Sequence, residues 1–210
     1  MLPPIILSIA GSDCSGGAGI QADIKTISAL GGYAASVITA VTAQNTLGVQ
    51  SVYPIPVDMV KAQITSVMDD LRPDAVKIGM VYDAGIVTTI VDCLQTYTPE
   101  CIVYDPVMIS TSGRRLMTEE TIQVIKTELF PLCTLITPNL NEACFGGEPL
   151  PALWRCSKRH RNYPADTIPL FSSKADIWRA MTCATCFIAG NLLPGLTSCH
   201  PDASSIPIPK

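Results

Sequence analysis

The chain has 210 residues, a hydrophobic fraction of 48% and a formal net charge of −4 at pH 7. A chain of this length and composition can bury the core of one domain of ordinary size. The acidic balance argues against a nucleic-acid or anionic-membrane surface, and no uninterrupted apolar stretch is long enough to cross a bilayer.

Apolar runs alternate with helix-like patterns through the first two thirds of the chain. The apolar runs predict buried strands at residues 4–10, 34–43, 75–80, 101–104 and 132–137. Apolar residues at helical spacing predict helices at residues 20–30, 57–71 and 84–97. Thr118 then opens a further helix, with Glu119 and Glu120 in the first turn, where negative charge suits the helix dipole. This alternation predicts an α/β fold of three layers, α/β/α, with a mostly parallel central sheet.

The first predicted strand leads into a glycine-rich turn, IAGSDCSGGAGIQAD, at residues 9–23. Its glycines allow positive φ angles and the close approach of a ligand to the backbone. We expect Asp13 and Ser15 to act as caps of the following helix, whose first N–H groups would face a ligand. The spacing matches neither GxGxxG nor GxxxxGK[ST], so neither of those phosphate-binding mechanisms is indicated. A tight connection without a ligand is the alternative.

Polar residues follow the carboxyl ends of the predicted strands. After the glycine turn come Gln44, in the predicted polar turn at residues 44–46, then Gly79 with Met80, Asp105 and Asn139. Ligands of open α/β sheets bind beyond these strand ends. The placement therefore favours a small-molecule site.

Five strings in this order carry a family resemblance: AGSDCSGGAGIQAD, VITAVTAQNT, KIGM, DPVM and TPNLNEA. They resemble the hydroxymethylpyrimidine and phosphomethylpyrimidine kinases of thiamine biosynthesis, members of the ribokinase-like superfamily, over residues 5–143. The resemblance implies phosphorylation of 4-amino-5-hydroxymethyl-2-methylpyrimidine and of its monophosphate, with ATP and Mg²⁺. It also allows a homodimer, and it implies neither a nucleic-acid nor a membrane partner.

The resemblance assigns roles to individual residues. The pyrimidine is expected against Gly11 and Ala18, with polar contacts from Asp23 and Gln44 and apolar walls from Met80 and Val107. An amide side chain suits an aminopyrimidine because it offers a donor beside an acceptor. Without the family, Met80 and Val107 would be interpreted as ordinary core residues.

Three further residues match the positions where the family handles the nucleotide phosphates: Asp105, Asn139 and Glu142. Of these, Asp105 and Glu142 are the expected Mg²⁺ ligands, and hard oxygen ligands suit this ion. Without the family, Asp105 is a strand-end residue, and Asn139 and Glu142 are helix caps. Lys25 is expected to be a solvated helix residue.

The alternating pattern stops after about residue 144. Up to residue 150 there are 7 basic and 15 acidic residues, whereas residues 151–210 hold 7 basic and 3 acidic ones. The family's Lys-Gly-Gly-His strand end and Gly-Thr-Gly-Cys-Thr loop are both absent from the printed sequence. In the family, the backbone N–H groups of that loop hold the transferring phosphoryl group, so none of its catalytic residues is retained here.

A shifted codon phase across residues 170–177 permits the missing Lys-Gly-Gly-His motif. We therefore interpret the segment after about residues 143–154 as a frameshifted translation. Residues 1–144 are expected to form an incomplete ribokinase-like domain, and residues 145–210 a poorly packed tail outside the family. This chain is accordingly expected to be an impaired or inactive kinase. The alternatives are a dead remnant that at most binds a pyrimidine, and a pyridoxal-type kinase.

The cysteines bear on the cellular compartment. Their number, nine, is odd, and those before residue 145 show no paired spacing, which favours reduced thiols in a cytoplasmic protein. Cys183, Cys186, Cys199 and His200 have zinc-like spacing. A frame slip would create such spacing by accident, so we do not expect a zinc site.

Overall fold

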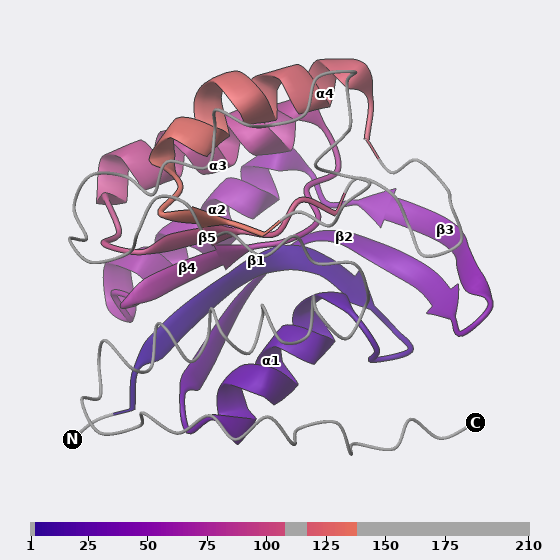
Figure 1. The fold of residues 1–210 in the computed structure, drawn as a ribbon, viewed down its shortest axis with the longest axis horizontal. Coiled ribbons are helices and arrows are strands. Elements are labelled where there is room, and N and C mark those ends of the chain that lie inside the picture. Colours follow the sequence, from indigo (N-terminus) through magenta and orange to yellow (C-terminus); the bar gives the residue numbers. More distant parts are fainter. Residues whose placement is uncertain (1–2, 108–116, 138–210) are drawn as a thin grey trace, which may run out of the picture.

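The structure is a computed structural model that describes residues 3–107 and 117–137, and it is built around a six-stranded sheet (Figure 1). In sheet order the strands are β3 (Gly48–Pro54), β2 (Tyr33–Asn45), β1 (Ile5–Asp13), β4 (Ala75–Ile78), β5 (Ile102–Tyr104) and β6 (Leu135–Ile136). All neighbouring strands are parallel except β2 and β3, which pair antiparallel. The prediction of a mostly parallel sheet is confirmed.

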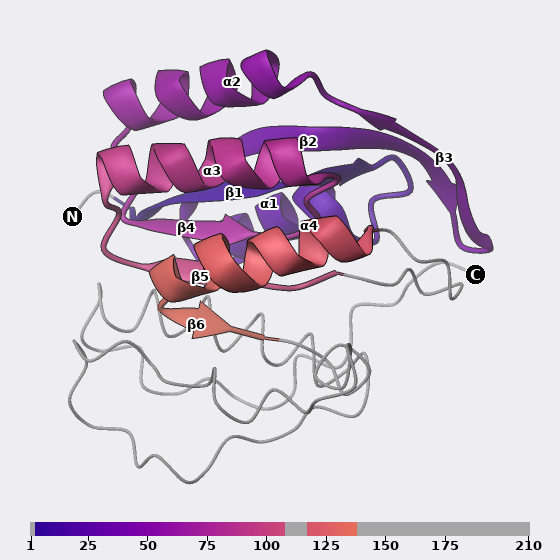
Figure 2. The ribbon, with the colours of Figure 1, turned by 90° about the horizontal axis from the view of Figure 1, so that it is seen from above.

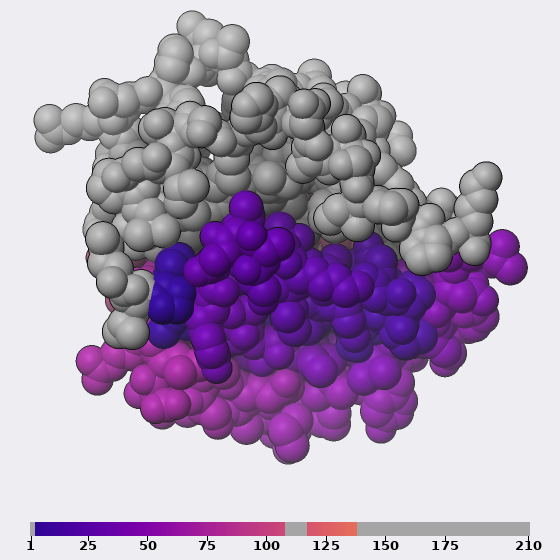
Figure 3. Space-filling model, turned by 90° about the horizontal axis from the view of Figure 1, so that it is seen from below, coloured from indigo at the N-terminus to yellow at the C-terminus, as the bar shows by residue number. Residues whose placement is uncertain are grey.

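Helices cover both faces of this sheet, as the three-layer prediction requires. They are α1 (Gly19–Ala29), α2 (Val57–Asp70), α3 (Ala84–Tyr97) and α4 (Glu119–Val124). The α4 helix continues through a π-helical turn (Ile125–Leu129) and a 3-10 turn (Phe130–Leu132). Figures 1 and 2 show α1 alone on one face among the described helices, with α2, α3 and α4 side by side on the other. In the space-filling view of the α1 side, the indigo and purple residues lie at the surface (Figure 3).

The larger core lies between the sheet and the layer formed by α2, α3 and α4. Leu7, Ile9 and Ile78 point into it from β1 and β4, and each is fully buried. Neighbouring positions such as Ile6 and Ala75 belong to a smaller cluster on the opposite face. Both faces of the parallel strands are thus covered, which explains their continuous apolar runs. Burying one such side chain contributes about 1.5–3 kcal/mol.

Two details of the fold correct the predictions. The predicted strand at residues 34–43 continues to Asn45, so Gln44 and Asn45 belong to a strand and not to the predicted polar turn. The strand β3 was not predicted from the sequence. Its residues are only partly buried or exposed, it lies at the sheet edge, and the turn before it, at Thr46 and Leu47, carries no glycine signal.

The predicted helix start at Thr118 is confirmed, and the predicted caps of α1 are wrong. The Thr118 hydroxyl accepts a hydrogen bond from the Thr121 N–H, as expected at the start of α4. The α1 helix begins after Ala18 without any side-chain cap, so Asp13 and Ser15 do not cap it. The Asp13 carboxylate instead binds N–H groups inside the turn that precedes the helix.

Some predictions fall outside the described residues: those for Asn139 and Glu142, for the tail and for the zinc-like cysteines. Within residues 3–107 and 117–137, no helix combines the length and the apolar character needed to span a membrane.

Candidate functional site

The Asp13 carboxylate organises the glycine-rich turn between β1 and α1. Its Oδ1 accepts hydrogen bonds from the Ser15 N–H at 2.9 Å and the Ser15 hydroxyl at 2.7 Å. Its Oδ2 accepts from the N–H groups of Gly17 at 3.1 Å and Ala18 at 2.9 Å. Asp13 is buried, whereas the donor residues Ser15, Gly17 and Ala18 are exposed. The carboxylate thus ties three residues of the turn to the end of β1.

Glycine is required where the first residue of α1 lies against β1. Gly19 has a φ of 57°, and a Cβ atom added to it would lie 2.2 Å from the Gly11 carbonyl oxygen. A side chain there would clash with the backbone and would also strain φ. The close approach seats the start of α1 directly on the end of β1.

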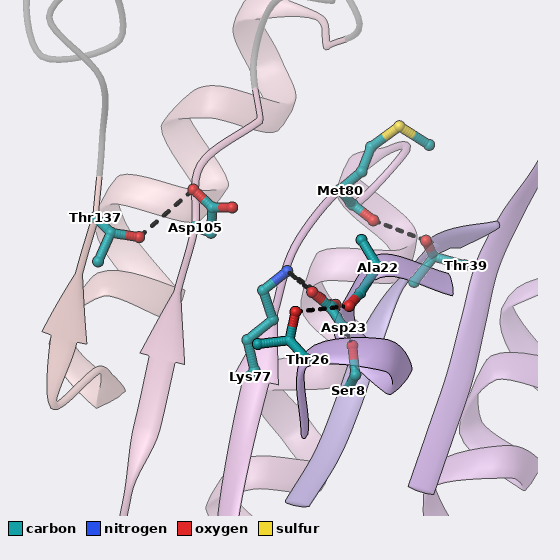
Figure 4. Close-up of polar contacts among 9 residues, drawn as sticks. All are labelled: Ser8, Ala22, Asp23, Thr26, Thr39, Lys77, Met80, Asp105 and Thr137. Atoms are coloured by element: carbon teal, nitrogen blue, oxygen red, sulfur yellow. Dashed lines mark hydrogen bonds and ion pairs between the residues drawn. The ribbon is translucent and has the colours of Figure 1, made fainter. Parts of the chain in front are cut away.

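Gly11 and Met80, two predicted pocket residues, lie against each other. A Cβ atom added to Gly11 would lie 2.7 Å from Cε of Met80, so glycine leaves the space that the thioether occupies. The Thr39 hydroxyl donates to the Met80 carbonyl oxygen at 2.7 Å and holds this loop against β2 (Figure 4). Gly11 is buried and Met80 is half-buried. Ala18 is exposed at the N-terminus of α1.

Gln44 lies beside the glycine turn although 30 residues separate it from Cys14 in the sequence. Sγ of Cys14 lies 3.2 Å from the Gln44 carbonyl oxygen and 3.3 Å from the Gln44 backbone nitrogen. The Gln44 side chain is half-buried, and its Oε1 lies 3.3 Å from the Thr42 hydroxyl. The end of β2 and the turn thus form one polar edge.

The Asp23 carboxylate, expected to contact the substrate, is bound to other residues of the chain. It is buried in α1 and forms an ion pair with Lys77 of β4, with 3.0 Å and 2.9 Å from Nζ to Oδ1 and Oδ2 (Figure 4). The Ser8 hydroxyl of β1 donates to Oδ2 at 2.5 Å. The carboxylate therefore joins α1 to two strands, and three short contacts already occupy it.

Lys77 was not singled out by the sequence analysis. Burial acts to lower the pKa of Lys77, but the negative charges of Asp23 and Asp105 outweigh it, so this pKa lies above the ordinary value of 10.5. Figure 4 places the lysine between these two carboxylates. The signal in the sequence was a lysine within an apolar strand, which needs an anionic partner once it is buried.

Asp105 follows β5 and is 9% exposed. Its N–H donates to the Ile78 carbonyl oxygen at 2.8 Å, and Oδ1 lies 3.4 Å from the Thr137 hydroxyl (Figure 4). Burial raises the pKa of Asp105; Lys77 and the Thr137 hydrogen bond oppose this rise, and the charge of Asp23 adds to it. A buried carboxylate that forms no ion pair within the described residues suits a metal ion.

The remaining predicted residues give a partial picture of the site. Val107 is half-buried, two residues after Asp105. Within the described ranges no three histidine, cysteine or acidic side chains gather into a metal-binding group. Lys25 is exposed as expected, but its Nζ is not simply solvated, because it donates to the Gly16 carbonyl oxygen at 2.9 Å.

We expect Cys14 to react with iodoacetamide far faster than Cys133 at pH 8. Cys14 is exposed, whereas burial raises the pKa of the Cys133 thiol to about 12. The thiolate is the reactive form, so only about one Cys133 thiol in ten thousand is reactive at this pH. Peptide mapping by mass spectrometry measures both rates in one sample. Equal labelling of the two under native conditions would contradict the placement of β6 and the turns before it.

The chain is similar in sequence to known kinases. The sequence profile of a family described as phosphomethylpyrimidine kinase matches residues 13–147. The hydroxymethylpyrimidine/phosphomethylpyrimidine kinase of Escherichia coli is 53% identical over 137 residues, which cover 65% of this chain and 52% of that protein. The chain thus spans about half the length of this relative.

Two solved structures resemble the fold. A phosphomethylpyrimidine kinase from Clostridium difficile 630 superposes with a TM-score of 0.64 at 52% identity, covering 67% of this chain and 61% of that one. The pyridoxal kinase from Staphylococcus aureus in complex with pyridoxal superposes with a TM-score of 0.60 at 31% identity. That match covers 68% of this chain and 52% of the other.

Proposed function

Because the chain belongs to the phosphomethylpyrimidine kinase family, we propose that its described residues form the pyrimidine-binding part of an ATP-dependent kinase. The proposed substrates are 4-amino-5-hydroxymethyl-2-methylpyrimidine and its monophosphate, on the route to thiamine diphosphate. The observation that carries the proposal is that Gln44 contacts the glycine turn at Cys14 while Met80 packs against Gly11, both at the strand ends. This is where a parallel sheet binds its ligands.

In the proposed reaction, the hydroxymethyl oxygen of the pyrimidine attacks the γ-phosphorus of ATP. The bond to the ADP oxygen breaks, and the hydroxyl proton is lost. Gly11, Ala18 and Met80 would pack against the ring, with Val107 as a further wall, and Gln44 would hydrogen-bond its polar edge. Such packing excludes water and orients the hydroxyl, which is the main protein contribution to phosphoryl transfer.

Asp105 is the described residue that would hold Mg²⁺, together with Glu142, and Asn139 would lie at the nucleotide phosphates. The fit of Asp105 rests on its burial and on the fact that, among the described residues, Lys77 forms its ion pair with Asp23 and not with Asp105. When bound, Mg²⁺ would neutralise charge on the phosphates. Lys77 adds positive charge nearby while it remains paired with Asp23.

Asp23 acts in this proposal mainly as an anchor. Its three short contacts to Ser8 and Lys77 leave it little capacity to bind a ligand directly. By fixing α1 to β1 and β4, it would hold the turn that faces the pyrimidine. A cytoplasmic location and a homodimer remain part of the proposal by family resemblance.

A pyridoxal-type kinase is the second candidate, favoured by the 31% identity to the Staphylococcus aureus pyridoxal kinase. The 53% identity to the Escherichia coli pyrimidine kinase supports the first candidate more strongly. Calorimetric titration of this chain with the pyrimidine alcohol and with pyridoxal separates them. Tighter binding of pyridoxal would overturn the pyrimidine proposal, and binding of neither would leave no support for a pocket in this chain.

Gln44→Leu is expected to weaken binding of the pyrimidine alcohol by about 1–3 kcal/mol, or roughly 5- to 150-fold. The leucine would leave buried polar atoms of the ligand without partners. Calorimetry of the purified variant measures the change. The control is Gln50→Leu, on the neighbouring strand, because the Gln50 side chain is exposed and contacts only Asn45 among the described residues. Equal affinity of the two variants would refute the assignment of Gln44.

A further inference from the structure

The Thr42 hydroxyl has one proton and two oxygen neighbours. It lies 2.9 Å from the Ser12 carbonyl oxygen and 3.3 Å from Oε1 of Gln44. A hydroxyl can donate only one hydrogen bond, although it can accept two. The shorter contact takes the proton, so the longer one would bring two oxygens together with no hydrogen between them. Thr42 is 6% exposed, which leaves little access for water to relieve this contact.

The direction of the hydrogen bond between Thr42 and Ser12 is fixed, because a backbone carbonyl can only accept and a backbone N–H can only donate. The Ser12 carbonyl is an acceptor only, so it must receive the Thr42 proton. On the other side of Ser12, the Asp13 backbone N–H donates to Oε1 of Gln21 at 2.9 Å, which leaves Nε2 of Gln21 to donate to the Ser12 hydroxyl at 2.7 Å. The donor and acceptor in each of these hydrogen bonds around Ser12 are therefore fixed.

Because the Thr42 proton goes to Ser12, the Thr42 oxygen can only accept from Gln44, and this decides which way the Gln44 amide faces. The oxygen and nitrogen of a carboxamide exchange places when it turns by 180°, and the hydrogen-bond network selects between the two orientations. With Nε2 toward Thr42, the amide donates to a lone pair of the hydroxyl, and the unfavourable contact becomes a hydrogen bond. The contact with Thr42 is the only hydrogen bond of this side chain within the described residues. Oε1 is then directed away from Thr42 and is available to a ligand.

We propose that Thr42 is a specificity-determining residue, which turns the Gln44 amide so that its carbonyl oxygen faces the ligand. A carbonyl oxygen accepts from the 4-amino group of the pyrimidine. It repels a 4-oxo pyrimidine, which presents an oxygen at the same position. Thr42 itself need not touch the ligand, and it acts through Gln44. The inference rests on the proposed function, because it takes Gln44 as the residue that binds the pyrimidine edge.

The test compares two ligands and two variants by calorimetry. The ligands are 4-amino-5-hydroxymethyl-2-methylpyrimidine and its 4-oxo analogue, and the variants are Thr42→Val and Thr42→Ser in the full chain. The wild-type chain is expected to prefer the amino compound by at least about tenfold, the usual effect of one unmatched buried polar contact. Thr42→Val should lose most of this preference, since valine keeps the shape but cannot accept from Nε2. Thr42→Ser should retain it.

The ratio of the two affinities is the decisive quantity, because a merely structural role of Thr42 would weaken both ligands equally. An unchanged ratio in Thr42→Val would overturn the proposal. A second measurement needs neither ligand nor variant: nuclear Overhauser effects in the free wild-type protein should connect the Gln44 side-chain N–H protons to the Thr42 side chain. Their absence would overturn the amide orientation. Binding of neither pyrimidine by the wild type would overturn the proposed function, and the role in specificity with it.

Discussion

The 210-residue chain is expected to phosphorylate the pyrimidine alcohol at least about a hundredfold more slowly than the same chain continued in the family's reading frame. The residues proposed to contact the pyrimidine and Asp105 belong to the described part of the chain, but the Gly-Thr-Gly-Cys-Thr loop is absent from the sequence. Phosphoryl transfer depends on donors that are placed in advance around the developing charge, and losing one such donor already costs on the order of a hundredfold. Here the whole loop is missing.

The measurement is ATP-dependent phosphorylation by the purified chain and by a restored chain whose residues after about 143 follow the kinase frame. Calorimetry with the pyrimidine alcohol is the control, since binding depends on the residues that both proteins share. Comparable turnover by the two proteins would show that the loop is dispensable and would refute the role assigned to it here. The frameshift interpretation has a separate test, which is sequencing of the coding DNA around residues 143–154.

Lys77→Met is expected to lower the free energy of unfolding by about 3–5 kcal/mol, the usual cost of leaving one partner of a buried ion pair alone. The variant would leave the Asp23 carboxylate, 3% exposed, with the Ser8 hydroxyl but without a cation. Because the pKa of Lys77 is raised, its contribution is complete below its ordinary value of 10.5 and is lost as the pH rises through the folded-state pKa. Denaturant unfolding at neutral pH therefore measures the full effect.

Two further variants make this prediction specific. Lys61→Met changes an exposed lysine of α2 and should stay within about 0.5 kcal/mol of the wild type. The double variant Asp23→Leu with Lys77→Met removes both charges and should recover most of the lost stability. A single Lys77→Met variant as stable as Lys61→Met would mean that the ion pair is not formed in solution.

The parallel part of the fold could be predicted because the pattern of apolar residues depends on which positions are buried. The run around Leu7 and Ile9 is apolar at every position, as a strand covered on both faces requires. The edge strand β3 shows no such apolar pattern, since its residues are partly exposed, and the two residues of its turn, Thr46 and Leu47, are not glycine. Strand ends were misjudged for a similar reason: Gln44 is polar, yet it pairs in the hairpin opposite Val49.

The site was predictable where it depends on local sequence and not where it depends on distant partners. Gly11 and Gln44 were found at strand ends, and the structure places both beside the turn. The partner of Asp23 is Lys77, 54 residues away in the KIGM string, and nothing in that string indicates which carboxylate the lysine pairs with. The orientation of the Gln44 amide depends on Thr42, whose hydroxyl reaches across to Ser12 of another strand. Periodicity contains no information about such contacts.

The Asp13 carboxylate has a consequence for the kind of ligand that the glycine turn can accept. Turns rich in glycine commonly bind anions because their N–H groups converge on one point. Here the N–H groups of Ser15, Gly17 and Ala18 already converge on a carboxylate that belongs to the chain itself. A phosphate brought to this point would meet like charge, and these three donors are already bound to Asp13. The carboxylate therefore takes the place that a bound anion would occupy in such a turn, and the N–H groups of Ser15, Gly17 and Ala18 do not form an anion site.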